Sequence, residues 1–316
     1  MHIAVVIPAF NVAPYLRDSL LSLLGQTHTN WSAVVVDDGS TDATGAVAAG
    51  FTDRRITLIR QDNAGVSAAR NTAIEAVLRC HPLATVATPV PDALLFLDGD
   101  DWLAPNALAL LAEALESAPR AVAAIGRYAR VALSGAVRLA PPPPEGCLLE
   151  RLLIRNLFAN GGHLLIRREA IEKAGAFRTD LWYGEDWEYW TRLAVQGAFV
   201  AVRSPAPLLF VRERPGSAYL SHGTDPAANQ PAMDAMYRHP GVTTRFGASR
   251  LVDLRRRADA ETAWSVGREL IRHGNRRDGQ HWLRRSFRAT PNLKRLALIV
   301  LSGFRFGPFR PYRTTG

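Results

Sequence analysis

Three carboxylates crowd one short stretch of the sequence, where Asp98, Asp100 and Asp101 follow directly on the apolar residues 94–97. Anions this close repel one another unless a cation neutralises them. Carboxylate oxygens on a short, open loop suit Mg²⁺ or Mn²⁺, which keep several waters and take further ligands from substrate phosphates. The stretch therefore favours a divalent-metal site over the alternative, a solvated turn that caps a helix starting near Pro105.

A second acidic group lies among aromatic residues, where Glu185 and Asp186 stand between Trp182 and Trp187. Aromatic rings can stack on the faces of sugars, and a less polar setting raises the pKa of a carboxyl group toward that of a general base. Asp186, or else Glu185, is then the candidate base, and the two tryptophans are candidates for acceptor binding. The alternative is an amphipathic helix whose tryptophans are core and whose acids favour its N-terminus through the helix dipole.

A third polar group follows the β-branched residues 34–36, where Asp37 and Asp38 precede a glycine. Carboxylates at the carboxyl end of a parallel strand lie where α/β sheets bind ligands, and they can accept a hydrogen bond from a base N–H or a ribose hydroxyl. An equal alternative is that Asp38, Ser40 and Asp42 only form the turn and cap the next helix.

A glycine-containing turn at residues 63–65 leads into a helical pattern that carries Arg70 and Asn71. Such a turn can present backbone N–H groups, and Arg70 its guanidinium, toward a phosphate or nucleoside. Equally, Arg70 is a candidate for an internal ion pair with the acidic loops.

The elements that position these groups alternate between short apolar runs and helical patterns. This rhythm is typical of a parallel sheet covered by helices, so the fold class is α/β. The three prolines of residues 81–91 predict a surface loop, and residues 147–158, 168–174 and the stretch from about Gly184 have helical patterns. The elements expected in the first hundred residues are strands at 3–7, 33–37, 56–60 and 94–97 and helices at 13–25, 42–49 and 66–79.

The bulk composition narrows the class of protein. With 316 residues, 47% of them hydrophobic, the chain can bury one large core and carry an appendage. Two cysteines are too few for a disulfide framework, and no signal-peptide pattern precedes the first apolar run, so a reducing cytoplasm is expected. No apolar run near the C-terminus approaches the roughly 20 residues that span a bilayer.

The C-terminal part has its own character. Residues 245–316 carry 17 Lys or Arg and 5 Asp or Glu, a net charge of +12, against +9 for the whole chain. We expect a catalytic domain at 1–240, with a nucleotide-sugar half at about 1–105 and an acceptor half at about 106–240, and a basic helical extension at 241–316. Within that extension, the spacing of Ala263, Gly267 and Leu270, followed by that of Trp282, Leu283 and Phe287, predicts two packed helices.

Five segments, in their order and spacing, resemble glycosyltransferase family 2. The resemblance covers about residues 2–215 and implies the GT-A fold, a Rossmann-like, mostly parallel sheet flanked by helices, here with a C-terminal helical extension. The segments are Val-Ile-Pro-Ala-Phe-Asn at 6–11, Val-Asp-Asp-Gly-Ser-Thr-Asp at 36–42, Asn-Ala-Gly-Val-Ser-Ala-Ala-Arg-Asn at 63–71, Phe-Leu-Asp-Gly-Asp-Asp at 96–101 and Gly-Glu-Asp at 184–186.

The resemblance also implies roles for single residues. Asp186 would be the catalytic base, and Asp100 or Asp101 the metal ligand. A later Arg212 or His222 would approach the diphosphate. The residues implied for the nucleotide-sugar site are Pro8, Ala9, Asn11, Asp38, which would face the base, Asp98 and Arg70.

The expected activity is that of an inverting, metal-dependent glycosyltransferase of cell-surface polysaccharide synthesis. The family resemblance favours a UDP-sugar as donor and a hydroxyl of a glycan or lipid-linked acceptor, handled at the cytoplasmic face of a membrane. A non-catalytic sugar- or nucleotide-binding protein is the alternative.

The basic tail of residues 245–316 suits an anionic membrane surface, a polyanionic acceptor or nucleic acid. No nucleic-acid partner is expected, because the tail matches no RRM, zinc-finger or KH signature. The packing of the tail on a second subunit, and with it the oligomeric state, is left open.

Overall fold

The computed structural model describes residues 1–78, 90–214 and 223–303 and divides into two compact units. The first unit is Met1–Leu148 with Leu157–Arg214, and the second is Leu149–Asn156 with Pro215–Gly316. These compact units part at Arg214, whereas the boundary expected from the sequence lies near residue 240. The short helix that follows Leu148 belongs to the second unit, where it packs with the C-terminal helices. The assignment of functions to domains stays a prediction.

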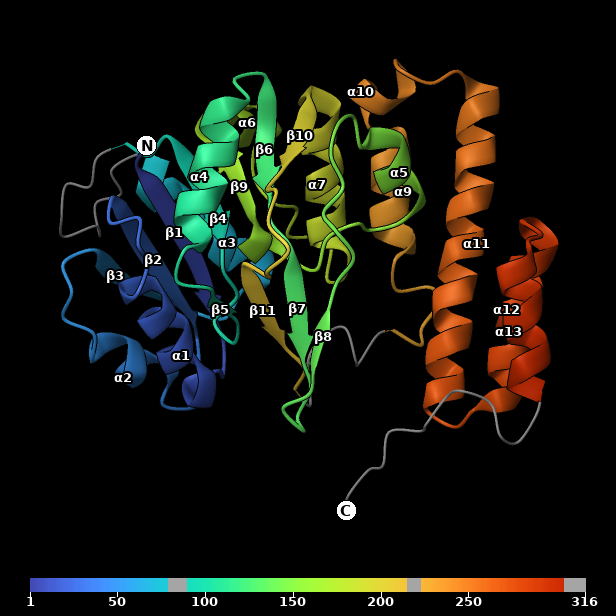
Figure 1. Ribbon diagram of the computed structural model, residues 1–316, viewed down its shortest axis with the longest axis horizontal. Helices are drawn as coiled ribbons and strands as arrows, with labels where there is room; N and C mark the ends of the chain where they lie inside the picture. The colour runs from blue at the N-terminus through green and yellow to red at the C-terminus, as the bar shows by residue number, and fades with distance from the viewer. Residues whose placement is uncertain (79–89, 215–222, 304–316) are drawn as a thin grey trace. The chain divides into compact units, whose positions relative to one another are not determined.

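A seven-stranded sheet is the centre of the first unit (Figure 1). Its strand order is β10-β6-β9-β4-β1-β2-β3, and all neighbours run parallel except β9, which is antiparallel to both β4 and β6. The order reverses between β1 and β4, and ligands of α/β sheets bind at the carboxyl ends of strands at such a point. The strands are β1 (Ile3–Ala9), β2 (Trp31–Asp38), β3 (Ile56–Gln61), β4 (Ala93–Phe96), β6 (Ala121–Ile125), β9 (Leu164–Arg167) and β10 (Ala198–Ala201).

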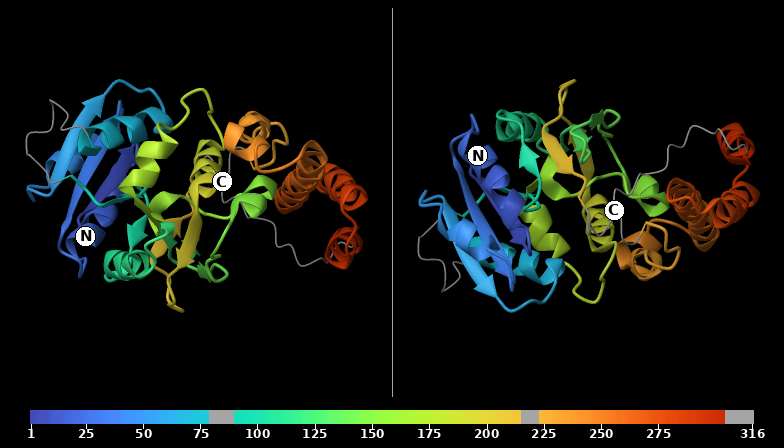
Figure 2. Two further views of the ribbon diagram at one scale, coloured as in Figure 1. Left: turned by 90° about the horizontal axis from the view of Figure 1, so that it is seen from above. Right: turned by 90° about the horizontal axis from the view of Figure 1, so that it is seen from below.

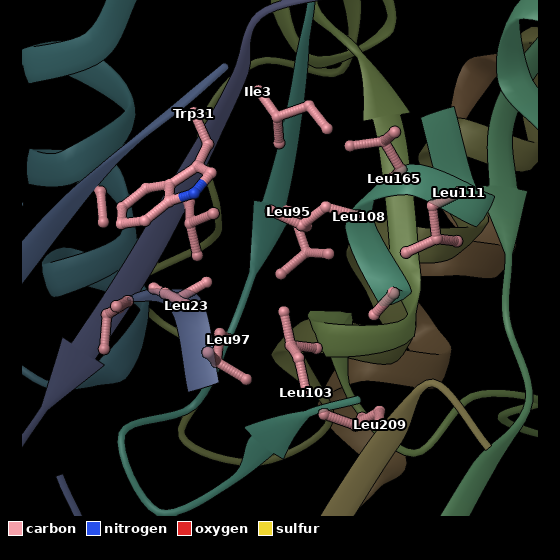
Figure 3. Close-up of a cluster of buried hydrophobic side chains, with 14 of the residues drawn as sticks. Ile3, Leu23, Trp31, Leu95, Leu97, Leu103, Leu108, Leu111, Leu165 and Leu209 are labelled. Atoms are coloured by element: carbon pink, nitrogen blue, oxygen red, sulfur yellow. The ribbon is translucent and has the colours of Figure 1, made fainter. Parts of the chain in front are cut away.

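Helices cover both faces of this sheet (Figure 2). On one face, α1 (Ala13–Leu24), α2 (Thr44–Ala49) and α4 (Ala107–Ser117) enclose an aliphatic core with Trp31 at its rim (Figure 3). On the other, α3 (Val66–Leu78) packs on β1 and β2. α6 (Arg168–Ala174) packs on α7 (Glu185–Gln196), and the Tyr189 ring of α7 lies 6.2 Å from that of Phe96.

A four-stranded sheet of short strands adjoins the first in the same unit. Its order is β5-β11-β7-β8, and it unites segments far apart in the chain: β5 pairs with β11 through Leu103 and Leu209. The strands are β5 (Trp102–Leu103), β7 (Tyr128–Val131), β8 (Val137–Leu139) and β11 (Leu209–Arg212). None of its strands was expected from the sequence, and the sheet holds the far side of the acidic loop.

The second unit is helical. The two packed helices expected from the apolar spacing are confirmed as α11 (Ala248–Arg272) and α12 (Arg276–Ala289), which approach closely at Gly267 and Gly279. A Cβ at Gly267 would meet the Gly279 carbonyl oxygen at 2.9 Å. The remaining helices are α5 (Leu149–Ile154), α9 (Gln230–Arg238), α10 (Pro240–Thr243) and α13 (Leu293–Gly303).

The four strands expected from the first hundred residues are confirmed, as are the helices at 168–174 and from Gly184 onward. Two helices are shorter than expected: that at 42–49 begins only at Thr44, and that at 147–158 is limited to Leu149–Ile154. The loop expected at 81–91 lies almost wholly outside the described residues. Within the described residues, no helix has the length and hydropathy to cross a bilayer.

Candidate active site

The acidic loop lies between β4 and β5, at the carboxyl end of the sheet. One buried amide holds two of its carboxylates together: Asn160 Nδ2 donates to Asp98 Oδ2 at 3.0 Å and to Asp101 Oδ2 at 2.6 Å. The other oxygen of Asp101 accepts from the Arg212 backbone N–H of β11 at 2.9 Å. The loop is therefore clamped from two sides by segments far along the chain.

Asn160 was not among the residues that the sequence analysis singled out. It precedes a short 3-10 helix, Gly161–His163, and its side-chain oxygen accepts from the Gly162 N–H at 2.9 Å. A Cβ at Gly161 would lie 2.5 Å from the Cβ of Phe96, so only glycine lets this turn approach the end of β4. The neighbouring Gly-Gly pair is a turn signal, but nothing local identifies the carboxylates that Asn160 binds.

The electrostatics of the loop fit a cation. Burial, with Asp100 and Asp98 close by, raises the pKa of Asp101 well above its usual range. Burial also raises the pKa of Asp98, against the opposing effect of the Arg70 guanidinium. A divalent ion would offset this repulsion between the carboxylates. Among the described residues no three His, Cys, Asp or Glu side chains form a metal-binding group. Mg²⁺ and Mn²⁺ commonly keep several waters and take further ligands from substrate phosphates.

Asp100 and Arg212 are both engaged within the loop. The Arg214 guanidinium forms an ion pair with the Asp100 carboxylate. Arg212 donates through Nε to the Asp100 carbonyl at 3.1 Å and through Nη2 to Asp18 at 2.9 Å, and its guanidinium lies 4.6 Å from the centre of the Trp102 ring. The diphosphate role implied for Arg212 stays a prediction, and His222 lies outside the described residues.

The acidic residues of the aromatic segment begin α7. Gly184 precedes the helix with φ 78°, a left-handed conformation that suits glycine, and Glu185 and Asp186 follow in the first turn. Burial and the neighbouring Glu185 raise the pKa of Asp186 to about 7, with Arg70 acting in the opposite direction. A carboxyl group with that pKa is half ionised near neutral pH, as a general base requires.

Arg70 of α3 joins the two acidic groups. Its Nη2 lies 3.2 Å from Asp98 Oδ1, and its Nη1 lies 2.9 Å from Glu185 Oε1. The guanidinium is buried, with 5% of the side chain exposed, and its central carbon lies 5.2 Å from the centre of the Phe177 ring. The structure thus contains the internal ion pairs that the sequence analysis held equal to ligand binding, and they place the two acidic groups at one site.

The carboxylate of Asp38 is held by the neighbouring loop. It accepts from the backbone N–H groups of Ala64 at 3.0 Å and Gly65 at 2.9 Å, and from Gln61 Nε2 at 2.7 Å. These bonds fix the turn at 63–65 that leads into α3 and so position Arg70. Contact between Asp38 and a base stays a prediction.

The loop after β1 is tied to the loop after β2. Asn11 has φ 51°, and its side-chain oxygen accepts from the backbone N–H of Thr41 at 2.9 Å. Pro8 and Ala9 are buried at the end of β1, next to this connection. The predicted nucleoside side of the site is therefore built from the carboxyl ends of adjacent strands.

The two tryptophans proposed for acceptor binding differ in exposure. Trp182 has 58% of its surface exposed, whereas Trp187 has 5% and lies in the core. Only Trp182 can offer a ring face to an acceptor in this conformation. Trp187 matches the alternative in which the helix buries its aromatic side.

Comparison with known proteins bears on the family and the fold. The model of the family described as Glycosyl transferase family 2 matches residues 4–175. Glycosyltransferase GlyA of Streptococcus pneumoniae is 42% identical over 103 residues, which are 32% of this chain and 13% of GlyA. WfgD of Escherichia coli, a UDP-Glc:alpha-D-GlcNAc-diphosphoundecaprenol beta-1,3-glucosyltransferase, is 33% identical over 104 residues, 32% of this chain and 36% of WfgD. The matched residues thus make up 13% of the length of GlyA and 36% of that of WfgD.

Solved structures share the fold at low identity. TarS residues 1–349 of S. aureus, in complex with UDP-GlcNAc, has a TM-score of 0.63 at 17% identity, covering 95% of this chain and 84% of that one. Mannosyltransferase PcManGT of Pyrobaculum calidifontis, in complex with GDP-Man and Mn²⁺, has a TM-score of 0.55 at 19% identity, covering 96% and 79%. The fold is GT-A, and with its family model matched over more than half its length, this chain belongs to glycosyltransferase family 2.

Proposed function

We propose that this chain transfers a sugar from a nucleoside-diphosphate sugar to an acceptor hydroxyl with inversion at the anomeric carbon. The observation that carries the proposal is the placement of Arg70, whose one guanidinium contacts both the acidic loop and the first turn of α7. A donor held by the loop and a base on α7 would then face each other across a few ångströms, as a displacement in one step requires.

The donor proposed is a UDP-sugar. WfgD is named for UDP-Glc, and TarS was solved with UDP-GlcNAc, whereas PcManGT was solved with GDP-Man, so the relatives favour UDP without excluding other nucleotides. The groups proposed to bind the nucleotide sugar are Pro8, Ala9, Asn11, Asp38, Asp98 and Arg70. In this structure Asp38 holds the turn that leads into α3, and Arg70 of α3 pairs with Asp98, which would keep the nucleotide pocket in shape.

The metal proposed is Mn²⁺ or Mg²⁺ at Asp100 and Asp101. When bound, it would act as a Lewis acid that neutralises charge on the departing nucleoside diphosphate. Asn160 and the Arg212 backbone N–H orient the Asp101 carboxylate, and Arg214 orients that of Asp100. These contacts limit the movement of the ligating oxygens, which favours a single coordination geometry.

Asp186 is proposed as the base that removes the acceptor proton. Its pKa of about 7 leaves a substantial share of the carboxylate ionised at neutral pH. As the acceptor oxygen bonds to the anomeric carbon, the bond to the diphosphate breaks on the opposite face and the proton passes to Asp186. One such displacement inverts the configuration of the carbon.

The acceptor proposed is a glycan or a lipid-linked sugar of cell-surface polysaccharide synthesis, met at the cytoplasmic face of a membrane by a peripheral protein. The WfgD name, with its diphosphoundecaprenol-linked acceptor, supports this class. The exposed ring of Trp182, two residues before Gly184, offers a stacking surface next to the proposed base.

A nucleotide-release assay with UDP-, GDP- and dTDP-sugars tests the proposal in the presence of Mg²⁺ or Mn²⁺. The variants are Asp100→Ala and Asp186→Asn, and the control is Asp180→Asn, whose side chain is 63% exposed and ion-paired with Arg178. We expect release from one donor that needs metal, is lost in the first two variants and is retained in the control. NMR of the product then reports the anomeric configuration, and retention would refute the single displacement.

A non-catalytic binding protein would give a different outcome in the same experiment. It would bind one donor, as measured by calorimetry, but would release no nucleotide with any acceptor tried. Retention of full activity by Asp186→Asn would instead overturn the assignment of the base while leaving the donor site intact.

A further inference from the structure

The outward face of α12 is cationic. α12 contains five arginines and one acidic residue, Asp278, which lies at the N-terminus and accepts from Asn275 Nδ2 at 2.8 Å. The residues that point away from the packed side recur at helical spacing and are exposed: Arg277, His281, Arg284, Arg285 and Arg288. The Arg285 guanidinium lies 4.8 Å from the centre of the Trp282 ring, which holds its stem against the helix.

The outward face of α13 is aliphatic. Leu293 is 85% exposed, Leu296 43%, Val300 52% and Leu301 46%, and all four fall on one side of the helix. The opposite side of α13 belongs to the core of the helical unit, because Leu298 and Ile299 pack against Trp264, Ile271 and Leu283. The exposed aliphatic stripe therefore lies outside that core.

The two faces differ from the surface of α11, which is also rich in arginine. α11 carries four acidic residues, and its arginines form ion pairs, as Arg255 does with Asp234 and Arg256 with Asp253. α12 has a single acid and α13 has none, so the arginines of these two helices have few acidic residues beside them in their own helix.

We propose that α12 and α13 form a membrane-docking surface for anionic phospholipid, defined by the four exposed arginines of α12 with His281 beside them and the four aliphatic residues of α13. Arginines near an anionic bilayer are attracted to it, and leucine and valine side chains gain by leaving water for the acyl boundary. Neither helix crosses the bilayer in this arrangement. Docking would bring the proposed transfer reaction to a bilayer surface, and only this role of the docking rests on the proposed function.

Lipid is favoured over other occupants by the pairing of the two chemistries. A nucleic acid would use the arginines but would leave the aliphatic stripe in water. A second copy of the chain would cover the stripe but would bring two cationic faces together, which is repulsive. An anionic bilayer offers a partner to both chemistries, because its headgroups attract arginines and its acyl boundary takes up aliphatic side chains.

Vesicle flotation of the full chain, without donor or metal, tests the surface independently of the enzymatic activity. Phosphatidylcholine vesicles are compared with vesicles that also contain phosphatidylglycerol, at low and at high salt. One variant removes charge, Arg284→Gln with Arg285→Gln, and one removes apolar surface, Leu296→Gln with Val300→Gln. The matched controls on α11 are Arg256→Gln and Val252→Gln, whose side chains are 58% and 71% exposed, respectively.

We expect flotation only with phosphatidylglycerol, weakened by salt. The charge variant should bind about 30-fold more weakly, which is the loss for two arginines near an anionic surface. The apolar variant should lose about tenfold or more, and both controls should match the unaltered chain. Equal binding by the charge variant and the controls would overturn the proposal.

Two further outcomes would also overturn it. The chain could fail to float with either vesicle while sedimenting as a dimer that the apolar variant dissociates, which would assign the stripe to a second copy. It could instead bind a labelled oligonucleotide through Arg284 and Arg285 without floating. If the unaltered chain releases nucleotide but does not float, only the docking surface is refuted. If it floats but releases no nucleotide, only the proposed reaction is refuted.

Discussion

The pH dependence of turnover follows from the environment of Asp186. With a pKa of about 7, its carboxyl group is about one-tenth ionised at pH 6 and about nine-tenths ionised at pH 8. If the ionised form removes the acceptor proton, kcat/KM should rise about tenfold between these values and level off above them. An ordinary aspartate would be fully ionised throughout and would give a flat profile.

The nearby cation supplies a second test of the same reasoning. Arg70 lowers the pKa of Asp186, so replacing its charge by Arg70→Met should move the rise to higher pH, whereas Arg70→Lys should keep it near its original place. Because Arg70 pairs with Asp98 and Glu185, Arg70→Met should also cost stability, about 3–5 kcal/mol. The profile must therefore be measured at a temperature where circular dichroism shows the variant folded.

The assay is nucleotide release at saturating Mg²⁺, with donor affinity measured separately at each pH so that binding and turnover are not confused. Asp186→Asn should be slow at every pH. A flat profile for the unaltered enzyme would refute the account. If Glu185→Gln removes the rise while Asp186→Asn keeps it, the base is Glu185.

Three further predictions concern stability. Asn160→Ala removes the amide that donates to both Asp98 and Asp101, so the free energy of unfolding in denaturant should fall by about 3 kcal/mol, and by less with Mn²⁺ present. The exposed Asn106→Ala should be neutral, and equal effects of the two changes would refute the bridge. Gly267→Ala should destabilise the fold by about 1–3 kcal/mol, because the added Cβ would meet α12. Gly247→Ala is the control, because a Cβ there would lie in open space. Equal melting temperatures of the two variants would contradict this packing. Because the pKa of Asp186 is raised, folding favours its protonated form, so the free energy of unfolding falls as pH rises through about 7. Asp186→Asn should therefore raise the free energy of unfolding by on the order of 2–4 kcal/mol at pH 8 but change it little at pH 4.

The parallel half of the sheet could be predicted because its strands are continuous apolar runs with a turn at each end. β1, β2 and β4 are buried along their whole length, and such runs leave a strong pattern. The smaller sheet left no comparable pattern. β5 has two residues, and Leu209, which pairs with its Leu103, lies more than a hundred positions later in the chain. No local sequence pattern therefore predicts this pairing.

The candidate site was predictable to the level of residue clusters and no further. Local composition identified the acidic loop and the first turn of α7, because charges crowded on loops have few structural uses. It could not identify Asn160, whose partners lie 59 and 62 positions away. Nor could it separate Trp182 from Trp187, since the two differ only in which way they face from the start of one helix.

The one antiparallel strand of the large sheet sets the order in which the chain can be completed during synthesis. Ala93 of β4 pairs with Arg167 of β9, and β6 reaches the rest of the sheet only through β9. Until residue 167 has left the ribosome, β4 therefore keeps an open hydrogen-bonding edge of four apolar residues, and β6 has no place to dock. A nascent chain stalled between β6 and β9 would be the species most prone to pair with a neighbour, and a chaperone that shields strand edges would have its greatest effect there.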